Sequence, residues 1–145
     1  MDELTELIGW QSPSFSVDIE QGRVAAFADA VLDDDPIYSD REEARVRGLS
    51  DQPAPMTFLG SIFFVEEEHE PELGFRVENT LHGEQQFSFE RSPKVGETLY
   101  GRTTLTDVYQ KDRDGGGAIT FAELESEYRD TNGELVATTV KVRLE

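Results

Sequence analysis

The stretch from residue 56 to residue 65 constrains the fold more than any other part of the chain, because it is apolar nearly all round. It begins a predicted helix that runs from 56 to about 68, with Pro55 at its start, a position that tolerates proline. A helix without a polar face has to be buried on every side and cannot lie on a surface. The rest of the chain must therefore supply a layer that encloses it.

The second half of the chain can supply that layer, because its apolar residues alternate with period two. Strands are predicted at 75–81, 84–91, 98–110, 118–129 and 134–144. Asn132-Gly133 indicates a hairpin between the last two strands, and residues 111–117 form a wider hairpin loop. An antiparallel sheet wrapped round a central apolar helix buries that helix completely, which predicts an α+β protein with the hotdog fold. A barrel or sandwich of these strands alone would leave the helix without a place to be buried.

The first half reads as short helices separated by stop signals. Gly9 ends the first helix, and Pro36 follows the second, because proline disfavours helical backbone in the residue before it. Asp40 is a predicted N-cap, with Glu43 three residues later completing a capping box. The predicted helices span 2–8, 19–31 and 41–48. The length of 145 residues suits one domain, and we expect residues 1–145 to form it.

The charge of the chain is strongly one-sided, with 31 acidic residues against 13 basic ones and a formal net charge of −18. Such a surface repels phosphate backbones, so we expect no nucleic-acid partner. Lysine is scarce as well, with only Lys94, Lys111 and Lys141. The acid excess and the lysine scarcity together are typical of a halophilic protein, whose self-repulsion is screened in molar salt.

Other functions are made improbable by what the composition lacks. There is no cysteine, which excludes disulfides and thiolate metal sites, and the two histidines are far apart, so no metal site is predicted. No apolar run reaches the roughly 18 residues of a membrane span. The start of the chain is acidic, whereas a secretory signal begins with basic residues. We therefore expect a cytoplasmic protein with no membrane partner.

Three segments carry a resemblance to a known family. They are FADAVLDDDPIYSD at 27–40, PAPMTF at 53–58 and LHGEQQF at 81–87. The first resembles the hydratase motif of the MaoC-like acyl dehydratases and hydratases, in which Asp, any residue, Asn, Pro, an aliphatic residue and His follow one another. The other two are similar to the N-terminal-domain type of this family, which includes the non-catalytic subunit of hydroxyacyl-ACP dehydratases. The resemblance extends from about residue 8 to residue 144.

The resemblance implies which residues would stand at the catalytic positions. In catalytic members an aspartate and a histidine activate one water molecule, which is added to or removed from the α,β double bond of an acyl thioester. Asp33 stands at the position of that aspartate, Asp35 at that of the asparagine and Tyr38 at that of the histidine. A tyrosine with a pKa near 10 is a poor general base at neutral pH, whereas imidazole titrates close to it. The replacement matches the non-catalytic type, in which a partner supplies the catalytic pair.

Each candidate also has a purely structural interpretation. Asp33 could belong to a solvated acidic loop that ends a helix, and Tyr38 could pack or line the substrate. His82, the one histidine in a family-like segment, is a candidate base or a hydrogen-bonding residue at an interface. At the start of the central helix a backbone N–H would polarise the thioester carbonyl, although these residues could also be simple core. The substrate-binding candidates are Pro55, Met56, Thr57 and Phe58.

We therefore expect a subunit of an (R)-specific enoyl-thioester hydratase or 3-hydroxyacyl-thioester dehydratase, paired with a second hotdog chain. Acyl-CoA or acyl-ACP would be its substrate, and no further cofactor is expected. One alternative is a self-sufficient homodimeric lyase that uses Asp33 with His82 or Tyr38. A second is a non-catalytic acyl-CoA or acyl-ACP binding module, and a third is a hotdog thioesterase.

Overall fold

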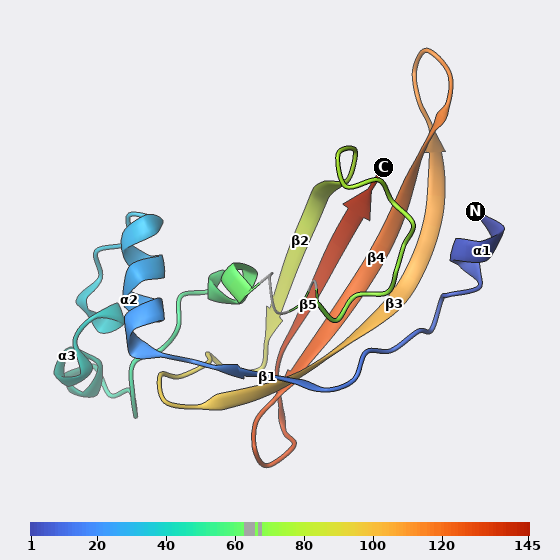
Figure 1. Ribbon diagram of the computed structural model, residues 1–145. Helices are drawn as coiled ribbons and strands as arrows, with labels where there is room; N and C mark the ends of the chain where they lie inside the picture. Colours follow the sequence, from blue (N-terminus) through green and yellow to red (C-terminus); the bar gives the residue numbers. More distant parts are fainter. Residues whose placement is uncertain (63–65, 67) are drawn as a thin grey trace.

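The computed structural model describes residues 1–62, 66 and 68–145. Within this part of the chain, five antiparallel strands form one sheet in the order β1-β3-β4-β5-β2 (Figure 1). The strands are β1 (Phe15–Asp18), β2 (Leu81–Phe89), β3 (Thr98–Asp112), β4 (Ala118–Arg129) and β5 (Leu135–Leu144). The short strand β1 and the longer β2 are thus the two edges.

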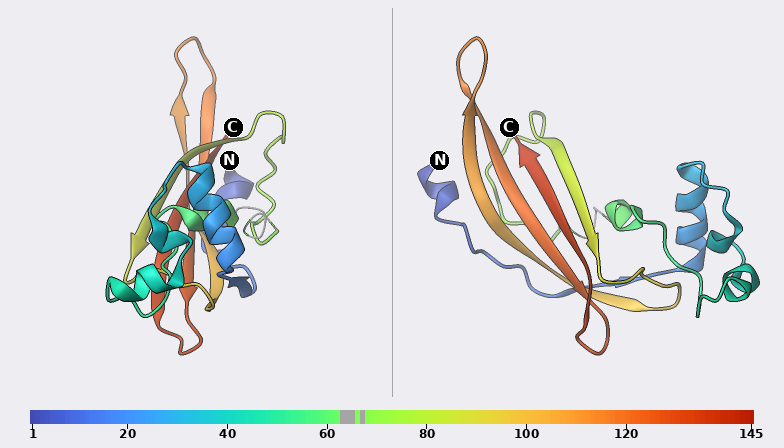
Figure 2. Two further views of the ribbon diagram at one scale, coloured as in Figure 1. Left: turned by 90° about the vertical axis from the view of Figure 1, so that its left-hand side faces the viewer. Right: turned by 180° about the vertical axis from the view of Figure 1, so that it is seen from behind.

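Among the helices that lie wholly in the described residues, all are short and all but one 3-10 helix lie away from the centre of the sheet. They are α1 (Asp2–Thr5), α2 (Gln21–Ala30), η1 (Pro36–Tyr38), α3 (Arg41–Val46) and η2 (Phe58–Ile62), of which η1 and η2 are 3-10 helices. Helices α2 and α3 lie together at one end of the molecule and α1 lies at the other (Figure 2). In the described residues, no helix is long and apolar enough to cross a membrane.

The main core forms where the inner face of the sheet meets η2. Phe58, Leu59 and Ile62 of η2 are each only 1% exposed and belong to one cluster with sheet residues such as Leu99 and Val136. A sheet that closes over a buried apolar segment is the predicted hotdog arrangement, which is confirmed. The predicted helix from 56 to 68 is only partly testable, because residues 63–65 and 67 lie outside the described residues; residues 58–62 form a 3-10 helix.

Most predicted strands match the observed ones within about three residues, but the strand predicted at 75–81 is wrong. The chain enters the sheet only at Leu81, which pairs with Leu144 at the very end of β5. No residue of β5 remains to pair with the segment before Leu81. Its apolar residues do not share one buried face either, since Phe75 packs against an apolar cluster whereas Val77 is 90% exposed.

Three local predictions can be compared with the structure. A strict period of two over the predicted strand 98–110 puts Leu105 and Val108 on opposite faces, but a bulge between Leu105 and Asp107 shifts the alternation, and both residues are buried in one cluster. The N-cap is confirmed, because the Asp40 carboxylate accepts hydrogen bonds from the N–H groups of Glu42 and Glu43. The first helix is shorter than expected and ends at Thr5.

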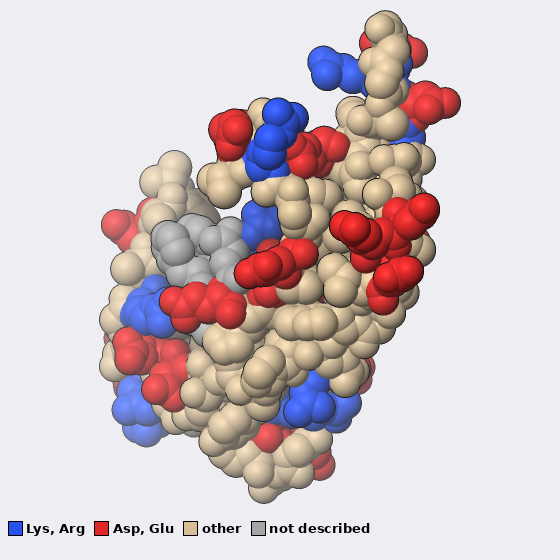
Figure 3. Space-filling model, turned by 45° about the vertical axis from the view of Figure 1, so that its right-hand side comes forward, with Lys and Arg blue, Asp and Glu red and all other residues tan. Residues whose placement is uncertain are grey.

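The hairpin between β3 and β4 extends beyond the rest of the sheet. Its tip projects from the body of the molecule and carries charged side chains of both signs (Figure 3). Three successive glycines, Gly115, Gly116 and Gly117, turn the chain there with positive φ angles, which explains the glycine run as turn chemistry.

Candidate functional site

The two motif positions, Asp33 and Tyr38, lie together in the connection between α2 and α3. Both line a small hollow of about 160 Å³. The remaining lining comes from the end of α2 and the same connection: Ala25, Ala28, Asp29, Asp34, Asp35 and Ser39. The structure therefore brings together two residues that the family motif places at the aspartate and histidine positions.

Local hydrogen bonds hold this acidic loop in shape. An Asp33 carboxylate oxygen accepts the Asp35 N–H at 3.1 Å, and an Asp35 carboxylate oxygen accepts the Ile37 N–H at 3.2 Å, which caps η1. Asp35 also forms an ion pair with Arg47, with 3.0 Å between nitrogen and oxygen. Asp35, at the asparagine position of the motif, is thus occupied with structural contacts, while Asp33 stays exposed beside the hollow.

The chemistry of this hollow is limited by its tyrosine. Burial raises the pKa of Tyr38 above its ordinary value of 10, and the negative charges of Asp33 and Asp35 raise it further. The hydroxyl therefore keeps its proton at neutral pH. It can donate a hydrogen bond to water or substrate, but it cannot accept a proton as the histidine of the motif would.

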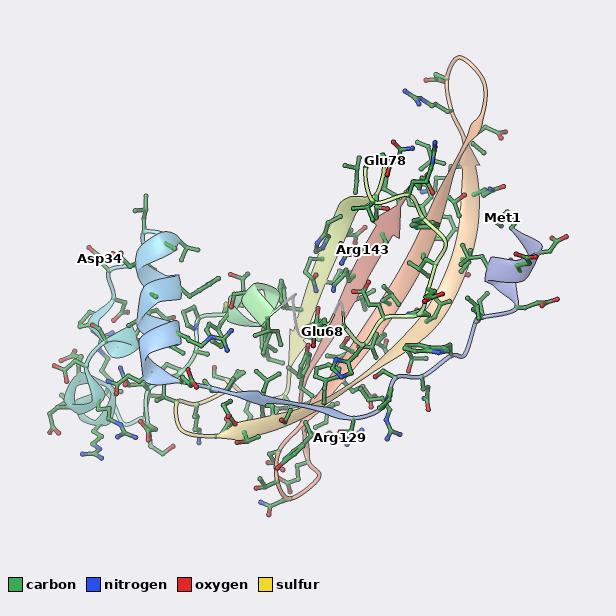
Figure 4. All side chains as sticks on the ribbon, viewed as in Figure 1. Met1, Asp34, Glu68, Glu78, Arg129 and Arg143 are labelled. Carbon is green, nitrogen blue, oxygen red and sulfur yellow. The ribbon has the colours of Figure 1, made fainter. Side chains whose placement is uncertain are left out.

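His82 does not join this hollow. It lies near the start of the edge strand β2, is exposed, and is paired in the sheet with Arg143. Figure 4 shows Arg143 and Asp34 in well-separated parts of the molecule, with η2 between them. Within one chain, therefore, the three catalytic candidates do not form one constellation.

The predicted substrate-binding segment is half buried and half exposed. Pro55 and Phe58 are buried, whereas Met56 and Thr57 are exposed, Met56 by 75%. The Phe58 N–H donates to the Pro55 carbonyl at 3.0 Å, so this amide is already used. The amides of Met56 and Thr57 have no hydrogen-bond acceptor among the described residues. Pro55 has no N–H, so Met56 and Thr57 carry the two candidate amides that donate to no described acceptor.

An apolar strip lies beside this segment at the open edge of the sheet. We call Gly60, Phe87 and Phe89 the edge strip. The two phenylalanine rings, half-buried on β2, stack with 6.4 Å between centroids and 2° between planes. A Cβ on Gly60 would come within 3.2 Å of the Phe87 ring, so η2 lies directly against it. A period of two puts Phe87 and Phe89 on one face of the predicted strand 84–91, but the sequence alone does not mark them as a possible site.

Farther along the same face, the sheet carries buried charges. We call Glu66, Glu70, Tyr128, Lys141 and Arg143 the ion-pair network. The Lys141 ammonium lies 2.8 Å from Glu66 and 2.7 Å from Glu70, Tyr128 donates its hydroxyl proton to Glu66, and Arg143 pairs with Glu70 at 3.4 Å. The side chains of Lys141 and Glu66 are only 4% and 3% exposed. Burial and the Glu66 charge raise the pKa of Tyr128 well above 10, so this hydroxyl remains a donor.

The network belongs to a polar band that divides the core in two. Next to it, the Thr103 and Ser126 hydroxyls share a hydrogen bond of 2.8 Å, and Thr139 pairs with Ser126 across the sheet. The main cluster around η2 lies on one side of the band, and a second apolar cluster containing Leu4 and Leu105 lies on the other. In the described residues, every buried polar side-chain atom has a hydrogen-bond partner.

Comparison with known proteins supports one family assignment. The model of the FAS1-like dehydratase domain region matches residues 6–139. A UPF0336 protein from Thermobifida fusca is 34% identical over 126 residues, covering 85% of this chain and 80% of the relative. A UPF0336 protein from Streptomyces griseus is 32% identical over 131 residues, covering 88% and 84%.

Solved structures agree with the fold. The C-terminally truncated HadBC complex of Mycobacterium tuberculosis, a 3R-hydroxyacyl-ACP dehydratase, aligns with a TM-score of 0.78 and 20% identity, covering 96% of this chain and 97% of that chain. The (R)-hydratase of A. caviae aligns with a TM-score of 0.71 and 20% identity, covering 94% of each. These likenesses confirm the hotdog fold, and the family match confirms the resemblance to MaoC-like dehydratases: the chain belongs to the FAS1-like dehydratase domain family.

Proposed function

We propose that this chain is the acyl-thioester-binding subunit of an (R)-specific enoyl-thioester hydratase or 3-hydroxyacyl-thioester dehydratase, and that a partner hotdog chain supplies the catalytic aspartate and histidine. The observation that carries the proposal is the hollow around Tyr38. Asp33 and Tyr38, which the motif resemblance assigns to the aspartate and histidine positions, both line this hollow, and a protonated tyrosine cannot act as the base. Similarity to proteins named as an (R)-hydratase and a 3R-hydroxyacyl-ACP dehydratase supports the reaction class.

The reaction divides between the two chains as follows. In hydration, a water molecule gives its oxygen to the β-carbon of the enoyl thioester and a proton reaches the α-carbon, so the partner has to supply the base and acid. Negative charge develops on the thioester oxygen during the reaction. In this chain the amides of Met56 and Thr57, two exposed residues, are candidate donors to that oxygen. The edge strip offers an apolar surface for the first carbons of the acyl chain.

The edge strand β2 is the candidate surface for the partner. It is nine residues long, and all of its residues are exposed or only half-buried. A long unpaired edge presents backbone donors and acceptors to another strand. Pairing there would place a second chain beside the edge strip. Two-chain assemblies among similar structures, the HadBC complex and the ChsH1-ChsH2 complex of Mycobacterium tuberculosis, support the existence of a partner chain.

The test is the loss of enoyl-thioester absorbance of crotonyl-CoA in molar salt. The chain is expressed with a tag in its native host and assayed once alone and once with the hotdog protein that co-purifies. Activity only with the partner supports the proposal. In that assembly, Tyr38→Phe should retain most of the activity, because the hydroxyl is not the base.

The opposite outcomes are equally informative. Activity of the pure chain, lost on changing His82 to Ala or Asp33 to Asn, would establish the self-sufficient homodimer instead. Binding of acyl-CoA without turnover, in the presence of the partner, would leave a binding module. A monomer in molar salt with no partner would contradict every version in which the acyl chain lies between two chains.

A further inference from the structure

Along the open edge of the sheet, the inner face changes within a few residues from apolar to charged. At one end, Phe89 and Phe87 of β2 stand opposite Ala137 and Thr139 of β5. Two residues farther along, Gln85 stands opposite the Lys141 of the ion-pair network. At about 3.3 Å per residue, the distance from Phe89 to Gln85 is about 13 Å. The apolar surface available to a ligand on this edge is therefore short.

The side chains at the centre of the ion-pair network leave no space between them, although Glu70 and Arg143 at its outer end line an open pocket of about 570 Å³. Lys141 and Glu66 are 3% and 2% exposed as whole residues, and the neighbouring Thr139 is 1% exposed. A side chain with so little accessible surface touches no gap wide enough for water, whether that gap opens to solvent or is enclosed. A hydrocarbon chain is wider than a water molecule and cannot pass between these side chains.

The network resists displacement as well as filling space. Lys141 is held by two carboxylates at 2.8 and 2.7 Å, and Glu66 also accepts a hydrogen bond from Tyr128. Pushing any one of these groups aside would leave a buried charge without its partner, which is strongly unfavourable. An apolar side chain at the same position could rotate away for a ligand at little cost. The network is therefore a firm boundary.

We propose that the ion-pair network, with Lys141 and Glu66 at its centre, ends the acyl-binding site and sets the maximum acyl chain length. This inference rests on the proposed function and adds the substrate class to it. An extended hydrocarbon advances about 1.3 Å per carbon, given a carbon–carbon bond of about 1.5 Å. The 13 Å of edge surface thus accommodates acyl chains of at most about ten carbons.

The test is a series of dissociation constants for saturated acyl-CoA ligands from four to sixteen carbons, with free CoA as reference. The protein is the chain with its co-purifying partner, in molar salt, measured by calorimetry. Each methylene that contacts the edge strip should tighten binding about fourfold, the equivalent of about 0.8 kcal/mol. Beyond about ten carbons, further methylenes should add nothing, and turnover of the corresponding enoyl-CoA should fall at least tenfold.

The matching variant opens the boundary without leaving an unpaired charge at its centre. Glu66→Ala, Lys141→Ala and Tyr128→Phe together remove both charges and the hydroxyl, while Arg143 still pairs with Glu70. In this variant the gain per methylene should continue beyond ten carbons. A control with Glu127→Gln and Arg129→Gln removes an exposed ion pair and should retain the original limit.

The outcomes separate this inference from the proposed function. No binding at any chain length would overturn the proposed function itself. Binding that tightens steadily to sixteen carbons in the unmodified protein would overturn only the boundary, and this result needs no variant. A limit that stays at ten carbons in a folded opened variant would also overturn it. The boundary is supported if the chain-length limit increases in the opened variant and stays at ten carbons in the control.

Discussion

Replacing Lys141 by methionine should destabilise the protein more than any surface substitution. Methionine keeps much of the volume of lysine but removes the charge that faces Glu66 and Glu70. Breaking a buried ion pair by removing one partner typically costs about 3–5 kcal/mol, because the remaining charge is left buried. Here Glu66 keeps the Tyr128 hydroxyl and Glu70 keeps Arg143, so we expect a loss of about 3 kcal/mol, at the lower end of that range.

Urea unfolding in molar salt measures this loss directly. The single tryptophan, Trp10, packs against the second apolar cluster and reports the transition by its fluorescence. For a domain of this size, about 3 kcal/mol corresponds to a fall in melting temperature of roughly 10 °C. The loss should be nearly the same at different molar salt concentrations, because buried charges are screened much less than exposed ones.

A compensated variant provides the control. Glu66→Leu, Tyr128→Phe and Lys141→Met together replace the centre of the network by apolar side chains. Replacing a whole buried ion pair in this way is often neutral or stabilising, so this variant should unfold close to the unmodified protein. The reasoning would be refuted if Lys141→Met alone unfolded at the midpoint of the unmodified protein. It would also be refuted if the compensated variant were less stable than the single one.

Three further predictions concern other parts of the molecule. The Tyr38 hydroxyl should titrate above pH 10 in NMR spectra of ring-labelled tyrosine, and Asp33→Asn should lower that pKa by removing a nearby negative charge. Because folding raises this pKa, the protonated hydroxyl stabilises the fold below pH 10, and this contribution is lost as the pH rises through the pKa of the folded state. An ordinary pKa near 10 would contradict the burial of this side chain. Gly101→Ala should cost about 1–3 kcal/mol in urea unfolding, because a Cβ there would overlap the Phe15 ring, and an unchanged midpoint would show that this ring moves freely. Transfer from molar salt to about 0.1 M should lower the urea midpoint, because the charges that give the net −18 then repel one another over a screening length of about 10 Å, compared with about 3 Å in molar salt. Equal midpoints would contradict the halophilic interpretation.

The sequence predicted the sheet well because each long strand carries its own signal. Residues 118–129 and 134–144 alternate with period two on both sides of Asn132-Gly133, and β4 and β5 match them closely. The cap of α3 was predictable for the same reason, since Asp40 and the amides it binds are neighbours in the chain. Both features are determined by residues close together in the sequence, so they do not depend on contacts with distant parts of the chain.

The errors arise where a distant partner decides the structure. The segment before Leu81 alternates like a strand, but it stays irregular because β5 ends at Leu144 and offers it no partner. The short strand β1 carries only four residues and was not predicted, because its pairing with β3 gives it no local signature. Asp33 and Tyr38 line one hollow because both belong to one loop, but the motif could not place His82 relative to them.

The ion-pair network was the hardest feature to predict, and the one signal of it in the sequence is the position of Lys141 in its strand. A buried charge contradicts the alternation that identifies a strand, so Lys141 reads locally as an ordinary exposed residue. Its two carboxylate partners lie far away in the sequence, and nothing in either segment indicates the pairing. Yet Lys141 occupies the inner-face phase set by Ala137 and Thr139, in a chain that uses lysine only three times. A lysine at an inner-face position is unusual in a chain with so few lysines, and the structure explains it by the two carboxylates within 3 Å of its ammonium.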